Sequence, residues 1–275
     1  MSFFGATELL QFWISGLRAG IRGRSFLTVF VLGIFLIFVA YLSGSFSPRQ
    51  PRTVALDIGL SGVRVTLVLL NIFWIQELLA NEIARKSVLF SLTYPVSRTA
   101  YFLGRYLSVL AMSALATLTF GLALLIAVNL SGGYYQQDFP VQLGLPLWLA
   151  LAGQFVDVAV VAAFAMFISS ISSSPMMSIA AGFAFAIGGK ALGATLDYLA
   201  AGADGDQKLV GTFGPLLEAI RWVLPDLSRL DWRDWPMYGV QPDTKAMVAA
   251  LFMALAYVTI ILGMTARTVA KREFS

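Results

Sequence analysis

Long apolar runs separated by short polar and charged segments dominate the chain. Each run approaches or exceeds about 20 residues, the length that an α-helix needs to cross the hydrocarbon core of a bilayer. The predicted spans are residues 26–44, 60–80, 99–129, 146–168, 176–200 and 246–266. We therefore predict an all-α polytopic membrane protein with six transmembrane helices, in which residues 1–275 form a single transmembrane domain. The third run is longer than a crossing needs, so its first turns are expected to project from the membrane.

A helix with two unlike sides is predicted before the first span, over residues 7–22. Its apolar stripe consists of Leu9, Leu10, Trp13, Ile14, Leu17 and Ile21, and its polar side of Glu8, Gln11, Ser15, Arg18 and Arg22. This pattern indicates an N-terminal interfacial helix whose basic side meets lipid head groups. The alternative is an amphipathic helix packed against a protein partner.

The polar segments between the spans predict the orientation of the chain. Residues 45–59 form the first loop on the far side, and residues 201–243 form a large outer-face loop with an amphipathic helix over residues 213–224 and a Trp-rich cluster. Six spans put both termini on one side, where ten basic residues gather: Arg18, Arg22, Arg24, Arg85, Lys86, Arg98, Arg105, Arg267, Lys271 and Arg272. Arg49, Arg52 and Arg64, assigned to the first outer loop, weaken this bias. By the positive-inside rule both termini are cytoplasmic.

Composition narrows the function classes further. Hydrophobic residues make up 58% of the chain and charged residues 12%, whereas soluble domains have roughly 45–50% and about 25%. The net charge of +4 is modest and clustered near membrane ends, which argues against a nucleic-acid partner. The chain has no Cys and no His, so disulfides, His-ligated haem, the usual zinc sites and His-based acid–base catalysis are excluded. We expect no metal site.

The most charged short segment lies between the second and third spans, over residues 82–98. In order it contains the acidic Glu82, the basic pair Arg85 and Lys86, an apolar turn with Val88 and Leu89, and then Tyr94, Pro95 and Arg98. Pro95 must end this turn, because it lacks an amide hydrogen and disfavours helix at the residue before it. Ser97 can cap the helix that follows. The pattern predicts a rigid charged elbow below a membrane hairpin, and the simpler alternative is a basic loop.

The order of these residues carries a resemblance to a known family. An acidic residue, a basic pair and an apolar turn precede Tyr-Pro-Val-Ser-Arg at residues 94–98 and Leu-Gly-Arg at residues 103–105. This resembles the cytoplasmic coupling segment of ATP-binding-cassette (ABC) exporter permeases of the type-2 class, most closely the branch associated with multicopper-enzyme maturation. The stretch at residues 224–233, Leu-Pro-Asp-Leu-Ser-Arg-Leu-Asp-Trp-Arg, is similar to the outer-face loop before the last span of the same permeases.

The resemblance implies a non-catalytic permease subunit in a bacterial inner (plasma) membrane. Its implied partners are a second copy of the permease, or a related permease, and a cytoplasmic ABC ATPase that binds ATP and Mg²⁺. The residues expected to contact the ATPase are Arg85, Lys86, Val88, Leu89 and Tyr94, with Pro95 as the break and Glu82 and Arg98 as the frame. An ATP-driven movement of this coupling segment would then be transmitted to the second and third spans together.

Asp157, Lys190 and Asp197 fall within the predicted spans, where a charge is costly. At a rise of 1.5 Å per residue, Asp157 lies ~16 Å from the cytoplasmic end of its span and Lys190 ~21 Å along its own. Because these depths are similar, we predict that Asp157 and Lys190 pair across the fourth and fifth spans. Asp197 falls on nearly the same side as Lys190, nearer the outer exit. The group could line an export path or form a structural ion pair.

Gly189 and Gly193 have the Gly-x-x-x-Gly spacing that lets another helix approach the fifth span closely. A dimer seam and packing within the subunit are both consistent with this spacing. Gly189-Lys190 is also the nearest match to a phosphate-binding loop, but Ala191 replaces the Ser or Thr and Ala184 the first Gly. We therefore expect no nucleotide site in this chain.

Three alternatives to an exporter remain at the level of sequence. The first is a membrane anchor or scaffold that transports nothing. The second is an ion-coupled secondary carrier that uses Asp157 and Lys190, for which internal repeats or broken helices would be expected. The third is an intramembrane enzyme, which is disfavoured because no nucleophile–base constellation is present.

Overall fold

A computed structural model describes residues 3–80, 98–132, 140–172, 174–200 and 225–271, together with the isolated residues 211, 213 and 215. The long helices are α1 (Phe3–Arg22), α2 (Arg24–Ser45), α3 (Pro51–Ile75), α6 (Arg98–Leu130), α7 (Leu145–Ile171), α8 (Pro175–Ala200) and α11 (Thr244–Lys271). The short elements are the π-helical η1 (Gln76–Ala80), the 3₁₀ turn η3 (Leu227–Leu230) and α10 (Asp234–Tyr238). Six helices are long and apolar enough to cross a membrane, which confirms the predicted all-α polytopic architecture.

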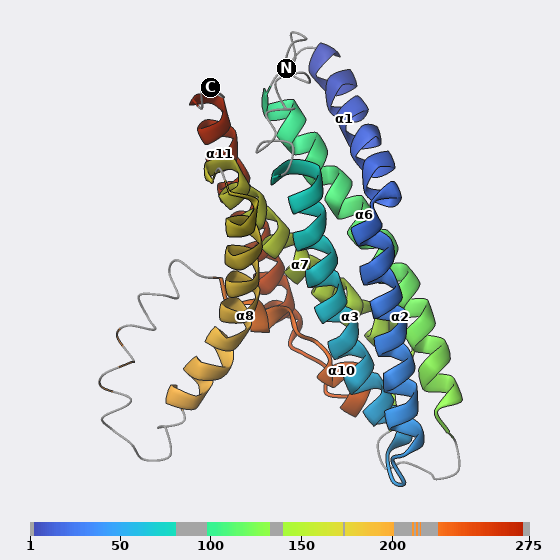
Figure 1. Cartoon of the computed structure of the whole chain (residues 1–275). Helices are drawn as coiled ribbons and strands as arrows, with labels where there is room; N and C mark the ends of the chain where they lie inside the picture. The colour runs from blue at the N-terminus through green and yellow to red at the C-terminus, as the bar shows by residue number, and fades with distance from the viewer. Residues whose placement is uncertain are drawn as a thin grey trace.

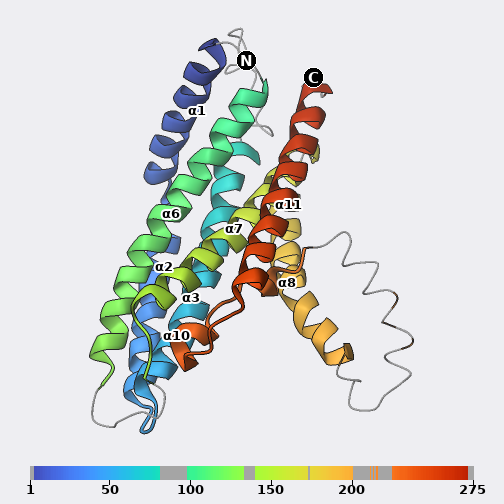
Figure 2. The ribbon, with the colours of Figure 1, turned by 180° about the vertical axis from the view of Figure 1, so that it is seen from behind.

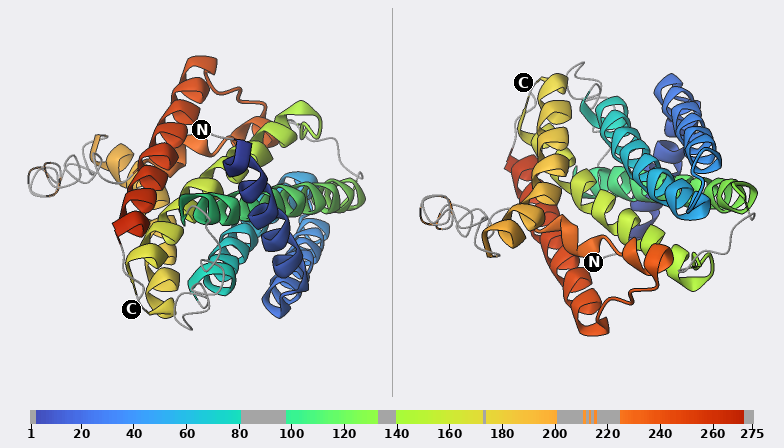
Figure 3. Two further views of the ribbon diagram at one scale, coloured as in Figure 1. Left: turned by 90° about the horizontal axis from the view of Figure 1, so that it is seen from above. Right: turned by 90° about the horizontal axis from the view of Figure 1, so that it is seen from below.

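The spans pack around α7, which contacts α3, α6, α8 and α11. Figures 1 and 2 show that both chain termini lie at one end of the bundle, together with the end of α3 and the start of α6. We call this the proximal end and the opposite one the distal end. The views along the bundle in Figure 3 show α2 and α11 at its periphery. In agreement, these two spans are the least buried of the six, at 22% and 17% of their apolar windows.

The first loop is shorter than predicted: of residues 45–59, residues 46–50 form the loop, and the assignment of residues 51–59 to it was wrong. Helix α3 begins at Pro51, directly after the short turn that ends α2 at Ser45. Proline is well tolerated at this first helical position, because its missing amide hydrogen would have no partner there and its φ angle suits a helix. The consequence is that Arg52 and Arg64 belong to a membrane span and not to a loop.

Helix α6 is longer than a bilayer requires, as predicted. Its 33 residues correspond to about 50 Å, whereas the hydrocarbon core is about 30 Å thick. Its first half lies beside α1, which runs along it towards the distal end (Figure 1). The part of α6 that exceeds the bilayer thickness is therefore covered by α1.

Helix α1 covers the predicted 7–22 segment and extends it to Phe3. Its buried side consists of Gly16 and Gly20, which lie against α6. The apolar residues Leu10, Ile14 and Ile21 stay exposed on another side. Of the predicted apolar stripe, Leu17 packs against the hydrophobic core, whereas Leu10, Ile14 and Ile21 form an exposed part. The exposed part is compatible with lipid contact, and the interfacial position of α1 stays a prediction.

Several predictions fall on residues that the structure does not describe. The coupling segment from Glu82 to Pro95 and most of the amphipathic helix at 213–224 lie outside the described residues. Arg98 is described as the first residue of α6, and Asp197 as part of α8, without their side chains. Trp232, a member of the Trp-rich cluster predicted in the outer-face loop, is buried.

Candidate functional site

A network of ion pairs links three spans to the segment before α11. It consists of two groups whose charges act on each other, the pair Arg64–Asp157 and the cluster of Asp57, Lys190, Asp231 and Arg233. Three of these side chains are cationic and three anionic, so the network as a whole is neutral. We call it the ion-pair network, and we call residues 225–238, which contain η3 and α10, the distal segment.

The inner pair of the network joins α3 to α7. The Arg64 guanidinium donates through Nε to Asp157 Oδ2 at 2.6 Å, and the two side chains are 16% and 3% exposed. Arg64 also reaches the carbonyl oxygen of Ala186 on α8 through Nη2, at 3.4 Å. One cation therefore contacts three helices at a depth where ionised groups need a partner.

The outer part of the network joins α8 and α3 to the distal segment. Lys190 Nζ lies 2.5 Å from Asp231 Oδ2, and Arg233 Nε lies 2.9 Å from Asp231 Oδ1. Arg233 continues to α3, where its Nη1 lies 3.3 Å from Asp57 Oδ1 and 3.0 Å from Ser61 Oγ. Asp231 is therefore held between two cations that belong to different parts of the chain.

The two cations beside Asp231 change the pKa of its carboxyl. Burial alone would raise the pKa of the Asp231 carboxyl, but the Lys190 ammonium and the Arg233 guanidinium together outweigh burial and hold that pKa below its ordinary value. The ionised carboxylate is thus the stable form, and it ties the distal segment to the bundle.

The predicted direct pair between Asp157 and Lys190 is wrong. Asp157 pairs with Arg64, and Lys190 pairs with Asp231. The two predicted partners do lie in one network, as their similar depths suggested. We missed Arg64 because we assigned it to a loop. A usable signal was present, since Asp57, Ser61 and Arg64 recur at helical spacing along one side of α3.

Two buried acceptor atoms beside the inner pair have no hydrogen-bond donor among the described residues. They are Asp157 Oδ1 and Gln154 Oε1. The amide nitrogen of Gln154 donates to the Leu60 carbonyl oxygen at 3.1 Å, which directs this side chain towards α3 as well. A buried acceptor without a donor costs about 1–3 kcal/mol. The α3–α7 contact can therefore accept hydrogen bonds from a donor group that comes between the two helices.

The glycine spacing on α8 serves the distal segment. A Cβ atom at Gly189 would lie 2.7 Å from Leu227 Cδ1, and one at Gly193 would collide with Ser228 Oγ. The predicted close approach at Gly189 and Gly193 is therefore real, but within the described residues the partner is the turn η3 rather than a transmembrane helix. This contact places Asp231 within reach of Lys190.

The Leu-Gly-Arg motif at residues 103–105 lies where α1 rests on α6, at the proximal end. A Cβ atom at Gly104 would lie 2.7 Å from Phe12 Cβ and 3.1 Å from the Leu9 carbonyl oxygen. One turn later, Ser108 Oγ lies 2.8 Å from the carbonyl oxygen of Trp13. The Arg105 guanidinium lies over the Tyr101 ring, 5.3 Å from its centroid, a distance typical of a cation–π contact. Gly104 is therefore needed for the close seating of α1.

The predicted coupling segment is flanked by two elements that both contact α1. Before it, α3 ends in the π-helical turn η1, and after it, α6 begins at Arg98. Helix α1 packs against both η1 and α6. At the junction of α1 and α2, a Cβ atom at Gly23 would lie 2.7 Å from Glu77 Oε2 of η1, so this junction is also tightly packed.

The described residues contain no group of three or more Asp, Glu, His or Cys side chains placed to hold a metal ion. No protein-family model matches this chain, and no curated protein is similar to it by sequence. The assignment of a function therefore depends on the arrangement described above and on the sequence motifs.

Proposed function

We propose that this chain is the permease subunit of an ATP-driven ABC exporter, in which a separate cytoplasmic ATPase moves two spans through the segment at residues 82–98. The observation that carries the proposal is the construction of the proximal end. There the segment joins η1 to α6, and α1 packs against both of its neighbours. A force applied to residues 82–98 would act on α3, α6 and α1 as one packed unit.

The proposed mechanism is a movement of α3 and α6 relative to α7 and α8. Closure of the ATPase pair would push the coupling segment and tilt α3 together with α6. Helix α3 carries Arg64 and Asp57 into the ion-pair network, whereas Asp157 and Lys190 lie on α7 and α8. Tilting α3 would therefore strain the Arg64–Asp157 pair and loosen the distal segment, which opens the end of the bundle away from the ATPase.

The proposed setting is a bacterial plasma membrane with both termini in the cytoplasm. The termini lie at the end of the bundle where α3 ends and α6 begins (Figure 1), which is the end where an ATPase would have to dock. The proposed assembly has two permease chains and two ATPase chains, because closed two-fold pairing is the commonest symmetry of such complexes.

The test uses paired substitutions at the two ends of the molecule. Lys86→Glu with Leu89→Asp changes the coupling segment, and the matched control, Lys245→Glu with Val240→Asp, makes the same kind of change at two exposed positions near the start of α11. Each variant is co-expressed with an ABC ATPase from the same genome that co-purifies with the unchanged chain, and the complex is reconstituted in liposomes. We expect the coupling variant alone to lose co-purification and stimulated ATP hydrolysis. Retention of both by the coupling variant would contradict the proposal.

An ion-coupled carrier is the second candidate, because Asp157 Oδ1 and Gln154 Oε1, which have no donor among the described residues, could take a proton or a protonated group. Uptake or efflux driven by an imposed pH gradient in liposomes, without any ATPase, would favour this candidate over the exporter.

A further inference from the structure

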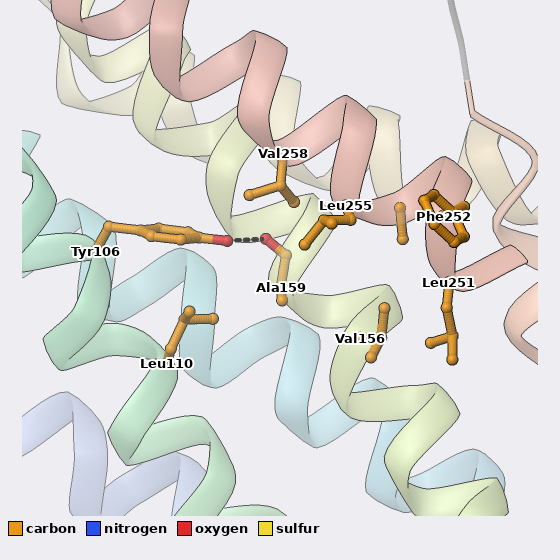
Figure 4. Close-up of a pocket in the computed structure, with 9 residues that line it drawn as sticks. Tyr106, Leu110, Val156, Ala159, Leu251, Phe252, Leu255 and Val258 are labelled. Carbon is orange, nitrogen blue, oxygen red and sulfur yellow. Dashed lines mark hydrogen bonds between the residues drawn. The ribbon is translucent and has the colours of Figure 1, made fainter. Parts of the chain in front are cut away.

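An apolar groove opens on the side of the bundle between α6, α7 and α11 (Figure 4). Its volume is about 390 Å³, and its lining residues are Tyr106, Leu110, Val156, Ala159, Leu251, Phe252, Ala254, Leu255 and Val258. All of these residues lie within the three membrane-spanning windows of their helices. The groove is therefore surrounded by hydrocarbon when the protein is in a bilayer.

The groove exists because α11 touches its neighbours with small side chains. At the level of the groove the buried residues of this helix are Ala250 and Ala254, whereas Leu255 and Phe252 remain largely exposed. Helix α11 packs against α7. On the facing wall, Tyr106 turns towards α7 and leaves space below α11. The last span is the least buried of the six that the described residues contain, and Leu251, Phe252 and Leu255 are exposed beside the groove.

The lining of the groove is almost entirely apolar. Tyr106 carries the one side-chain polar atom among the lining residues, and its hydroxyl donates to the carbonyl oxygen of Ala159 at 3.0 Å (Figure 4). All other lining side chains are aliphatic or, in Phe252, aromatic. A polar or charged ligand would lose its hydration there without compensation, whereas a hydrocarbon chain loses nothing.

The shape of the groove favours a single extended chain. The lining residues of α11 span positions 251–258, about 11 Å along the helix axis, and those of α6 and α7 are each separated by about one turn. A groove of this length between three helices can hold a run of methylene groups. Between membrane helices the driving force is not removal from water but close packing, since lipid tails are as apolar as leucine.

We propose that this groove binds one acyl chain of a bilayer phospholipid, and that the bound chain completes the packing of α11 against α6. The proposal does not depend on the exporter assignment, because it concerns the permease chain in lipid without any ATPase. A bound chain would contact α6, α7 and α11 together, so it would exchange more slowly than a chain that contacts one exposed helix face.

The test uses nanodiscs that contain the full chain and a phospholipid with a photoactivatable diazirine in its acyl tail. After illumination, mass spectrometry maps the lipid adducts. About ten extra carbon–carbon contacts suffice for a preference of about five-fold. We therefore expect adducts on residues 106–110 and 251–258 about five-fold above those on the exposed α6 residues Leu118 and Leu122.

Two variants close the groove in different ways. Ala159→Phe fills it from α7, and Leu255→Trp covers it from an exposed position, where a change of size does not disturb the core. The matched control, Ala184→Phe, adds the same side chain at an exposed position on α8. We expect both groove variants, but not the control, to reduce the adducts on residues 106–110 and 251–258 to the level of Leu118.

Three results would overturn the proposal. The first is an even distribution of adducts over all exposed apolar helix faces. The second is an enrichment in the groove that survives both Ala159→Phe and Leu255→Trp in monodisperse protein. The third is efficient disulfide formation between two copies that carry Leu255→Cys in this otherwise cysteine-free chain, because a second copy would then occupy the groove. None of these results bears on ATPase coupling, which the variants of residues 86 and 89 test separately.

Discussion

Replacement of Arg64 by methionine should destabilise the folded bundle more than any other single change in the ion-pair network. The substitution keeps most of the apolar stem but removes the only donor to Asp157 among the described residues, since Asp157 Oδ1 has none. The Asp157 side chain is 3% exposed, whereas that of Arg64 is 16% exposed. The charge that is left behind is therefore almost fully shielded from water.

The expected magnitudes follow from this asymmetry. Removing one partner of a buried ion pair costs about 3–5 kcal/mol, because the other charge is left uncompensated. We expect about 4–5 kcal/mol for Arg64→Met and about 3 kcal/mol for Asp157→Asn, because in the second variant Arg64 keeps the Ala186 carbonyl oxygen as acceptor. The double variant leaves no unpaired charge. It should cost no more than the larger single change, so the coupling energy is about 3 kcal/mol.

The assay is reversible unfolding in mixed micelles with increasing amounts of denaturing detergent, followed by the fluorescence of the six tryptophans. Arg49→Met is the matched control, because it makes the same substitution at an exposed position. The reasoning is refuted if Arg64→Met lies within about 1 kcal/mol of the wild type, or if the two single costs simply add in the double variant. The reciprocal exchange, Arg64→Asp with Asp157→Arg, should recover part of the loss.

Three further predictions test other parts of the structure. The low pKa of Asp231 stabilises the fold at neutral pH, and this contribution is lost as the pH falls below the ordinary value of 3.8. Lys190→Met should therefore reduce the fall in melting temperature between pH 6 and pH 3. An unchanged fall would exclude Lys190 as a cause of the lowered pKa. Gly104→Ala should weaken the packing of α1 on α6, which lowers the free energy of unfolding by about 1–3 kcal/mol and speeds hydrogen exchange of the α1 amides. Gly263→Ala, whose added Cβ meets nothing within 4 Å, should have neither effect. Equal exchange in both variants would contradict the packing argument. In the cysteine-free chain, Ser87→Cys should react with an impermeant maleimide only in inside-out vesicles and Ser47→Cys only in right-side-out vesicles, and the reverse pattern would exclude cytoplasmic coupling.

The length and spacing of apolar runs were sufficient to predict the membrane helices. A helix in hydrocarbon must satisfy its backbone hydrogen bonds within itself, so each span can be recognised without knowledge of its neighbours. The same locality explains the one large error in the boundaries. Residues 51–59 are polar enough to resemble a loop, but they form the first turns of α3, which packs against α2 and buries Thr53, Ala55 and Leu56.

Partner choice among the buried charges could not be predicted from depth alone. Depth placed Asp157 and Lys190 at one level of the bundle, and both do belong to the ion-pair network. Which cation meets which carboxylate depends on how α3, α7 and α8 are rotated about their axes. It also depends on the turn η3, which reaches Lys190 because Gly189 and Gly193 leave room for it.

The sequence by itself therefore determined the number of spans, their order, the amphipathic helix before them and the presence of charges within them. Only the tertiary structure decided that Arg64 neutralises Asp157, that Asp231 neutralises Lys190, that α1 rests on α6 through Gly104, and that small residues on α11 leave a groove. The physical reason is the range of the interactions. The length of an apolar run is a property of one helix, whereas ion pairs and close packing depend on how several helices are rotated relative to one another.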